Sequence, residues 1–114
     1  MKGSNNVSAK FRTMIFAAMM LSGMQPAMAW DGFISGTVVA LEITAGNNYA
    51  FRVHLSGASN ACGTGATWGY LNETDSNYKV YVAAILAAKA QGSTVTLFLT
   101  QVNGYCQIGH VSIT

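Results

Sequence analysis

The sequence predicts a small, mainly β domain with one helix, folded as a five-stranded barrel with the helix between the third and fourth strands. Three observations predict this class. Only residues 77–91 of the expected mature chain have a helical composition, rich in Ala and free of Gly and Pro. Five other segments are rich in β-branched and aromatic residues, and turn residues separate them. Their order is three strands, the helix and two strands.

The first 29 residues have the features of a signal peptide. Three basic residues, Lys2, Lys10 and Arg12, precede a short apolar core at residues 14–24. This core is shorter than the roughly 20 residues that span a bilayer. Ala27-Met28-Ala29 matches the small-x-small cleavage pattern. We therefore expect cleavage before Trp30, a periplasmic or secreted protein without a membrane span in its mature chain, and a single domain over residues 30–114.

Little charge remains in the expected mature chain. The full chain has a formal net charge of +2, but three of its six basic residues belong to the signal segment. Three cations and four carboxylates are left, a net charge of −1: Arg52, Lys79 and Lys89 against Asp31, Glu42, Glu73 and Asp75. Nucleic-acid binding needs a clustered basic face, so no nucleic-acid partner is predicted.

Cys62 and Cys106 are predicted to form a disulfide. They are the only cysteines of the chain, both lie in the exported part, and an oxidising compartment favours pairing. A domain of this size has a marginal core, and closing this loop would stabilise it by about 4 kcal/mol. No metal site is predicted, because the cysteines and the scattered His54 and His110 lack ligand spacing.

The first three strands are predicted at residues 33–44, 49–56 and 66–71. The turn cluster Ala45-Gly46-Asn47-Asn48 joins the first two as a hairpin. Apolar residues alternate along the second strand and should share one face: Tyr49, Phe51, Val53 and Leu55. Residues 57–65 have the composition of a loop, and Cys62 would tether it.

The helix is predicted from Asn77 to Gln91, with Gly92 as its C-cap. The N-cap candidates are Thr74, Asp75 and Ser76. One face can cover the end of the barrel: Tyr78, Tyr81, Val82, Ile85 and Ala88. The rest is small and apolar, which favours contacts between copies in a ring: Val80, Ala83, Ala84 and Ala87. The alternative is that Ala is simply a tolerated surface helix former.

The last two strands are predicted at residues 93–102 and 105–114, joined by the hairpin turn Asn103-Gly104. The alternation slips at Gly109, which indicates a bulge. This order of strands and helix favours a Greek-key barrel, the OB-fold, and a flat sheet with one packed helix is the competitor. The barrel is preferred because it removes exposed strand edges.

No catalytic set is predicted, so the chain is expected not to be an enzyme and to need no cofactor. Serines can be combined with His54 or His110, but no nucleophile elbow accompanies them. Glu73 and Asp75 precede the helix and are interpreted as first-turn acids that complement its dipole. The glycine-rich residues 57–65 lack the Lys-Ser/Thr ending of a phosphate loop.

A binding module remains, and an exported barrel commonly offers its loops to ligands such as oligosaccharides. Sugar recognition needs an aromatic platform and fixed polar groups. The aromatic candidates are Trp30, Trp68 and Tyr70. The polar candidates are Asp31, Ser35 and Asn72. The alternative for Trp68 and Tyr70 is a place in the core, which we favour for Trp68.

Short motifs along most of the mature chain carry a family resemblance. They are the run WDGFISGTVV at residues 30–39, Ala61-Cys62, Trp68-Gly69, and the helix that ends in Gly92 before a Val-containing strand. In this order and spacing they resemble the B subunits of subtilase-cytotoxin and pertussis-like AB5 toxins. Small exported bacterial proteins of unknown role share much of the same pattern.

The resemblance implies an OB-fold subunit that forms a ring of five, binds sialylated host-cell glycans and carries a catalytic A subunit into cells. It implies sugar contacts at Asp31 and Ser35, and it puts Leu99 where the family has a tyrosine contact. Trp30 and Asn72 complete the candidate glycan site. Two hypotheses follow: a non-catalytic glycan-binding B-type subunit, or a small exported protein that acts through protein–protein contacts without a toxin role.

Overall fold

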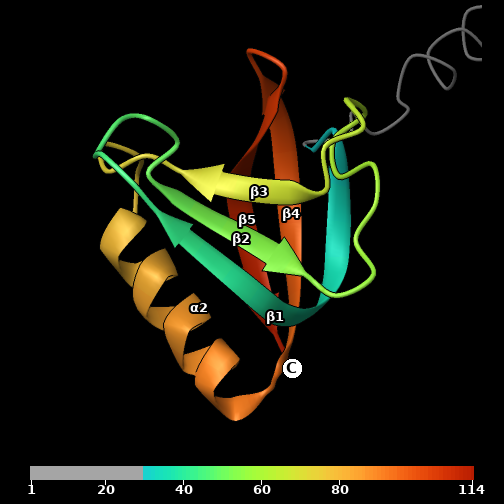
Figure 1. Ribbon diagram of the computed structural model, residues 1–114, viewed down its shortest axis with the longest axis vertical. Helices are drawn as coiled ribbons and strands as arrows, with labels where there is room; N and C mark the ends of the chain where they lie inside the picture. Colours follow the sequence, from blue (N-terminus) through green and yellow to red (C-terminus); the bar gives the residue numbers. More distant parts are fainter. Residues whose placement is uncertain (1–29) are drawn as a thin grey trace, which may run out of the picture.

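The computed structural model describes residues 30–114, and the predicted signal peptide at residues 1–29 lies outside this range. The described residues form five strands and one helix (Figure 1). They are β1 (Gly32–Ile43), β2 (Phe51–Leu55), β3 (Trp68–Leu71), α2 (Tyr78–Gln91), β4 (Thr94–Val102) and β5 (Tyr105–Ile113). The prediction of a mainly β chain with one helix and five strands is confirmed.

The strands are hydrogen-bonded in the order β1-β2-β3-β5-β4, and β4 returns to β1, so the sheet is a closed barrel. Strand β1 makes this closure possible because its first half, residues 32–37, pairs with β4 and its second half, residues 38–43, pairs with β2. Figure 1 shows the sharp bend between the two halves. Gly36 lies there, and a side chain at this position would collide with Ser56.

The interior is filled by the alternating apolar residues of the strands. Phe51, Val53 and Leu55 of β2 are buried, as predicted from their spacing. Tyr49 does not share their face, because it precedes β2 and its backbone is left-handed, with φ of 52°. The other large buried residues of the core are Ile34, Leu71, Ile85, Val95, Leu97, Leu99 and Ile108.

Helix α2 begins one residue later than predicted. Asn77 is the N-cap, in the left-handed conformation and without a side-chain cap, so the candidates at residues 74–76 are wrong. The first turn holds no acidic residue, which also corrects the interpretation of Glu73 and Asp75. Asp75 instead accepts a hydrogen bond from the Asn72 backbone N–H at 2.8 Å, which closes the turn before the helix. Gly92 is the left-handed C-cap, as predicted.

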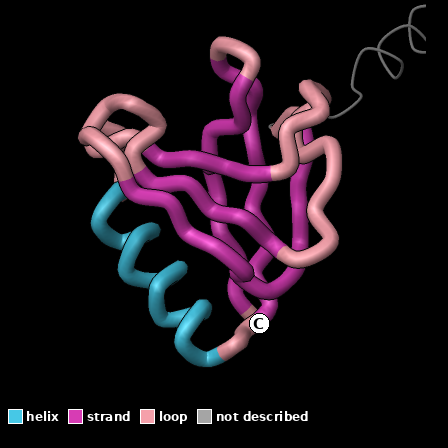
Figure 2. Tube along the Cα trace, viewed as in Figure 1, coloured by secondary structure: helices cyan, strands magenta, loops and turns pink. Residues whose placement is uncertain are grey.

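The helix packs against the core beside β1 and β4, and Figure 2 shows it running between the loop after β3 and the start of β4. Ile85 and Ala88 are buried against the core, and Tyr78, Tyr81 and Val82 pack beside them. The opposite side is apolar and exposed, with Val80 62% and Leu86 46% exposed. None of the helices within residues 30–114 is both long and apolar enough to cross a membrane.

Cys62 and Cys106 form the predicted disulfide, with their Cα atoms 5.7 Å apart. The bridge ties the loop after β2 to the second residue of β5. The same loop lies over the start of β1, where a side chain on Gly32 would collide with the Ala61 carbonyl. The disulfide therefore holds β1, β5 and the loop together at one end of the sheet.

Candidate functional site

One outer face of the sheet carries a row of aromatic side chains beside a row of hydroxyls. Cross-strand pairing puts Phe33, Phe98 and His110 in one row, and Ser35, Thr96 and Ser112 in the next. The Phe98 ring lies 5.9 Å from Phe33, 5.1 Å from His110 and 6.2 Å from Trp30. We call this surface of β1, β4 and β5, with Trp30 at its edge, the Trp30 face.

A cavity of about 370 Å³ opens beside Trp30, in the space between the start of α2 and strands β4 and β5. Its size is at the lower end of the range for small-molecule sites. Its lining combines the aromatic rings with several polar groups: Trp30, Asp75, Ser76, Tyr81, Thr100, Gln107, Ile108 and Gly109. The cavity therefore offers an aromatic wall and hydrogen-bonding groups in one place.

The cavity depends on a bulge at Gly109. Phe98 pairs with His110 and Leu99 pairs with Ile108, so Gly109 is the extra residue of β5, as its slipped alternation predicted. A side chain at Gly109 would collide with the Trp30 ring, which covers the bulge. The Gly109 carbonyl oxygen accepts a hydrogen bond from the Tyr81 hydroxyl at 3.1 Å. The bulge thus positions two aromatic residues of the cavity.

Three of the four predicted glycan contacts, Trp30, Asp31 and Ser35, lie on β1 or just before it. The Asp31 carboxylate accepts a hydrogen bond from the Gln101 backbone N–H at 2.7 Å, and its residue is exposed. Ser35 Oγ lies 2.9 Å from Thr96 Oγ1 in the hydroxyl row. Ser35 and Trp30 thus share the Trp30 face, with the Phe33–Phe98 pair between them.

The remaining candidates do not join this face. Asn72 Oδ1 accepts a hydrogen bond from the Ala50 backbone N–H at 3.3 Å, so its side-chain amide binds the backbone of the segment before β2. Asn72 does not line the cavity. Trp68 is half-buried on the outside of β3, so its expected place in the core is wrong. Leu99 is fully buried inside the sheet, and this position cannot supply a ligand contact.

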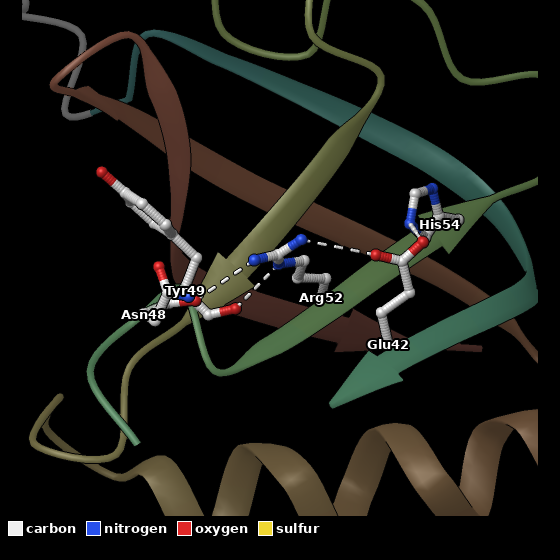
Figure 3. Close-up of polar contacts among 5 residues, drawn as sticks. All are labelled: Glu42, Asn48, Tyr49, Arg52 and His54. Carbon is white, nitrogen blue, oxygen red and sulfur yellow. Dashed lines mark hydrogen bonds and ion pairs between the residues drawn. The ribbon is translucent and has the colours of Figure 1, made fainter. Parts of the chain in front are cut away.

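A second aromatic cluster covers the outside of β2 and β3 and is centred on Arg52. We call it the Arg52 face; its members are Glu42, Tyr49, Arg52, His54, Trp68, Tyr70 and Tyr105. Arg52 donates from Nε to the Tyr49 carbonyl at 3.0 Å and from Nη2 to the Asn48 carbonyl at 3.2 Å (Figure 3). Its guanidinium also lies 5.5 Å from the Trp68 ring centre and 3.5 Å from the Glu42 carboxylate.

Histidine and tyrosine side chains complete the Arg52 face. His54 Nε2 lies 3.4 Å from Glu42 Oε1 but lacks hydrogen-bond geometry, and it is buried without another partner among the described residues. Tyr49 packs edge-on against Tyr70 at 4.7 Å and beside Tyr105 at 4.5 Å. Burial raises the pKa of the Tyr70 phenol above its ordinary value of 10.0, and Tyr49 and Asp75 raise it further.

Sequence reasoning missed the cavity residues on β4 and β5, although one signal could have found them. Counting back from the Asn103-Gly104 turn pairs Thr100 with Gln107, and the structure has this pair. Both residues have outward parity, and the bulge at Gly109 follows directly. Bulges are over-represented beside functional sites, so the two signals together point to this place.

The cavity brings together groups that can bind a ligand: an indole ring, a carboxylate, hydroxyls and an amide. Within residues 30–114, no group of three or more His, Cys, Asp and Glu side chains is placed to hold a metal ion. No family model, curated protein or solved structure matches the chain. The family resemblance of the short motifs therefore stays a prediction, and the geometry of the Trp30 face carries the functional argument.

Proposed function

We propose that residues 30–114 form a non-catalytic, glycan-binding OB-fold subunit, exported from the cell and assembled as a ring that carries a catalytic partner. The single observation that carries the binding part is the cavity beside Trp30, where an indole wall meets the Asp75 carboxylate and the polar side chains of Thr100 and Gln107. Sugar rings have an apolar face and many hydroxyls, and this cavity offers a partner for each.

The strand order supports the OB-fold part of the proposal. A sheet closed as β1-β2-β3-β5-β4, with α2 between β3 and β4 in the chain, is what a five-stranded Greek-key barrel of this class requires. Ser35, to which the family resemblance assigns a sugar contact, lies on the same outer face as Trp30. An extended glycan seated in the cavity would reach toward it across Phe33 and Phe98.

The exposed side of α2 supports the ring. Val80, Ala83 and Ala87 are exposed, and Ala84 is half-buried. Val39 and Ile43 of the neighbouring strand β1 are also exposed, at 57% and 72%. Apolar surface gathered in this way marks an interaction site. The ring predicts a pentamer in size-exclusion chromatography with light scattering, and a strictly monomeric protein would contradict it.

A pair of tryptophan variants tests the glycan proposal on the exported protein. Trp30→Ala removes the cavity wall and should lower binding on a glycan array by about tenfold or more, since stacked aromatics dominate such contacts. Trp68→Ala is the matched control, because Trp68 lies on the Arg52 face and should leave binding unchanged. A wild-type protein that binds no glycan on the array would overturn the proposal.

Protein–protein contact without a toxin role is the second candidate, and the Arg52 face favours it. Tyr, Trp and Arg dominate the energetics of protein interfaces, and this face joins Tyr105, Trp68 and Arg52 in one cluster. Pull-down from the native compartment would then recover a stoichiometric protein partner. Loss of that partner with Trp68→Ala, while Trp30→Ala retained it, would favour this candidate over glycan binding.

A further inference from the structure

The charge of the Trp30 cavity determines which sugars it can accept. Of the side chains of the described residues that line it, Asp75 alone carries a formal charge at neutral pH, and no Lys, Arg or His is among them. Asp75 Oδ2 accepts one hydrogen bond, from the Asn72 backbone N–H. A carboxylate has about four acceptor sites, so it can still accept from the hydroxyls of a sugar.

None of the three basic side chains of residues 30–114 is placed to offset Asp75. Arg52 belongs to the other face, where two carbonyl oxygens and Glu42 hold its guanidinium. Lys79 is two residues from Tyr81 on α2, and residues so spaced point to opposite sides of a helix. Lys89 lies in the last turn of α2, whereas the cavity lies at its start.

The start of α2 would by itself attract an anion, because a helix N-terminus carries a partial positive charge. Asp75 lies two residues before the N-cap Asn77, outside the first turn, and its Oδ2 atom accepts from the Asn72 backbone N–H. A carboxylate brought by the ligand would meet the full negative charge of Asp75 beside a helix end that carries only about half a positive charge. The local field therefore opposes an acidic ligand.

From these charges we infer that the Trp30 cavity selects neutral sugar residues over acidic ones. The inference rests on the proposed glycan binding and deepens it by naming the ligand class. A neutral ring stacks on Trp30, and its hydroxyls donate to the Asp75 carboxylate and exchange hydrogen bonds with Thr100 and Gln107. A sialic acid carries a carboxylate of its own, which repels Asp75, so this selectivity departs from what the toxin resemblance implies.

The test compares two oligosaccharides that differ only at the terminus, one ending in galactose and one capped with sialic acid. Calorimetry is done near pH 9, where the α-amino group left by cleavage before Trp30 is largely neutral. The galactose-terminated probe should bind about tenfold or more tightly. Tighter binding of the sialylated probe would overturn the inference and leave glycan binding standing. Binding of neither probe, nor of any array glycan, would overturn the proposed function itself.

A charge-neutral variant separates electrostatics from shape. Asp75→Asn keeps an acceptor for the Asn72 N–H and should shrink the preference for the neutral probe by about threefold or more, as expected for one charge in a solvated site. Glu73→Gln removes the same charge outside the cavity lining and should leave the preference unchanged. An unchanged preference in Asp75→Asn would overturn the inference.

Salt provides a second measurement that needs no variant. Raising the ionic strength from about 0.01 M to about 1 M shortens the screening length from about 30 Å to about 3 Å. The affinity of the wild-type protein for the sialylated probe should therefore rise toward that for the neutral probe. A preference that is insensitive to salt would show that shape and not charge selects the ligand, and would overturn the inference.

Discussion

On the Arg52 face, charged and aromatic groups contact one another, whereas on the Trp30 face they surround an open cavity. The Arg52 guanidinium is held by two carbonyl oxygens, a carboxylate and an indole ring. Trp30, by contrast, covers a glycine, and a cavity of about 370 Å³ remains next to it. Aromatic and polar residues are present on both faces, so composition does not distinguish a closed cluster of side chains from an open cavity.

The two faces differ because a tight turn adjoins the Arg52 face, whereas a bulge adjoins the Trp30 face. Tyr49 is held at a φ of 52°, which costs about 1–3 kcal/mol for a bulky residue. Arg52 offsets this cost by binding the Tyr49 and Asn48 carbonyls of the turn between β1 and β2. The Trp30 face has a bulge where the other has a tight turn, and the bulge turns a carbonyl toward Tyr81. The comparison predicts stability effects on one face and binding effects on the other.

The largest expected effect comes from the disulfide, because it supports both faces. Cys106 lies between Tyr105 of the Arg52 face and Gln107 of the cavity. Replacing both cysteines by Ala should lower the free energy of unfolding by about 4 kcal/mol, measured by denaturant titration. Glycan binding should fall with it. A loss of less than about 1 kcal/mol would show that sheet closure alone holds β5 in place.

Much of the fold could be predicted because its signals are local. The Asn103-Gly104 turn fixed the β4–β5 register, the slipped alternation located the bulge at Gly109, and Gly92 marked the end of α2. The start of α2 was missed because Asp75, a good N-cap by type, uses its carboxylate for the Asn72 N–H one turn earlier. Local propensity cannot show that a side chain already has another partner.

The grouping of the candidate residues in space was predicted only in part, for a reason of geometry. Trp30 and Ser35 share the Trp30 face, and their role in sugar binding stays a prediction. Trp68 and Asn72 lie away from Trp30, because β1 bends and pairs with β4 at one end and with β2 at the other. Which aromatics share a face depends on that long-range pairing, and single residues do not reveal it.

Arg52→Leu should affect stability and leave binding intact. The variant loses two hydrogen bonds to the strained turn, the contact with Trp68 and the ion pair with Glu42. Its free energy of unfolding should therefore fall by about 1–3 kcal/mol. Arg52→Lys keeps the charge without the planar fork, so its loss should be intermediate. Denaturant titration and the glycan array measure the two properties separately. A large loss of glycan binding in a folded Arg52→Leu protein would contradict the division between the faces.

Gly109→Ala should have the reverse effect. The added methyl group displaces the Trp30 ring, so binding should weaken by about tenfold while the free energy of unfolding changes by less than about 1 kcal/mol. Combining it with Trp30→Ala checks the mechanism. Because both changes act through the same ring, the double variant should bind no more weakly than Trp30→Ala alone. Additive losses would show that the bulge contributes to the site without Trp30.

The smallest expected effect concerns Tyr70, which is only 2% exposed beneath Tyr49 on the Arg52 face. Burial raises the pKa of its phenol above 10.0 in the folded protein. At a pH between the pKa of the unfolded chain and that of the folded protein, the unfolded chain has therefore lost a proton that the folded protein retains. Stability from this group is therefore complete below about pH 10 and declines as the pH rises further. In Tyr70→Phe this part of the decline should disappear, as measured by denaturant titration at about pH 8 and about pH 11. An equal decline in both proteins would mean that Tyr70 titrates normally and that the packing of Tyr49 over it excludes little water.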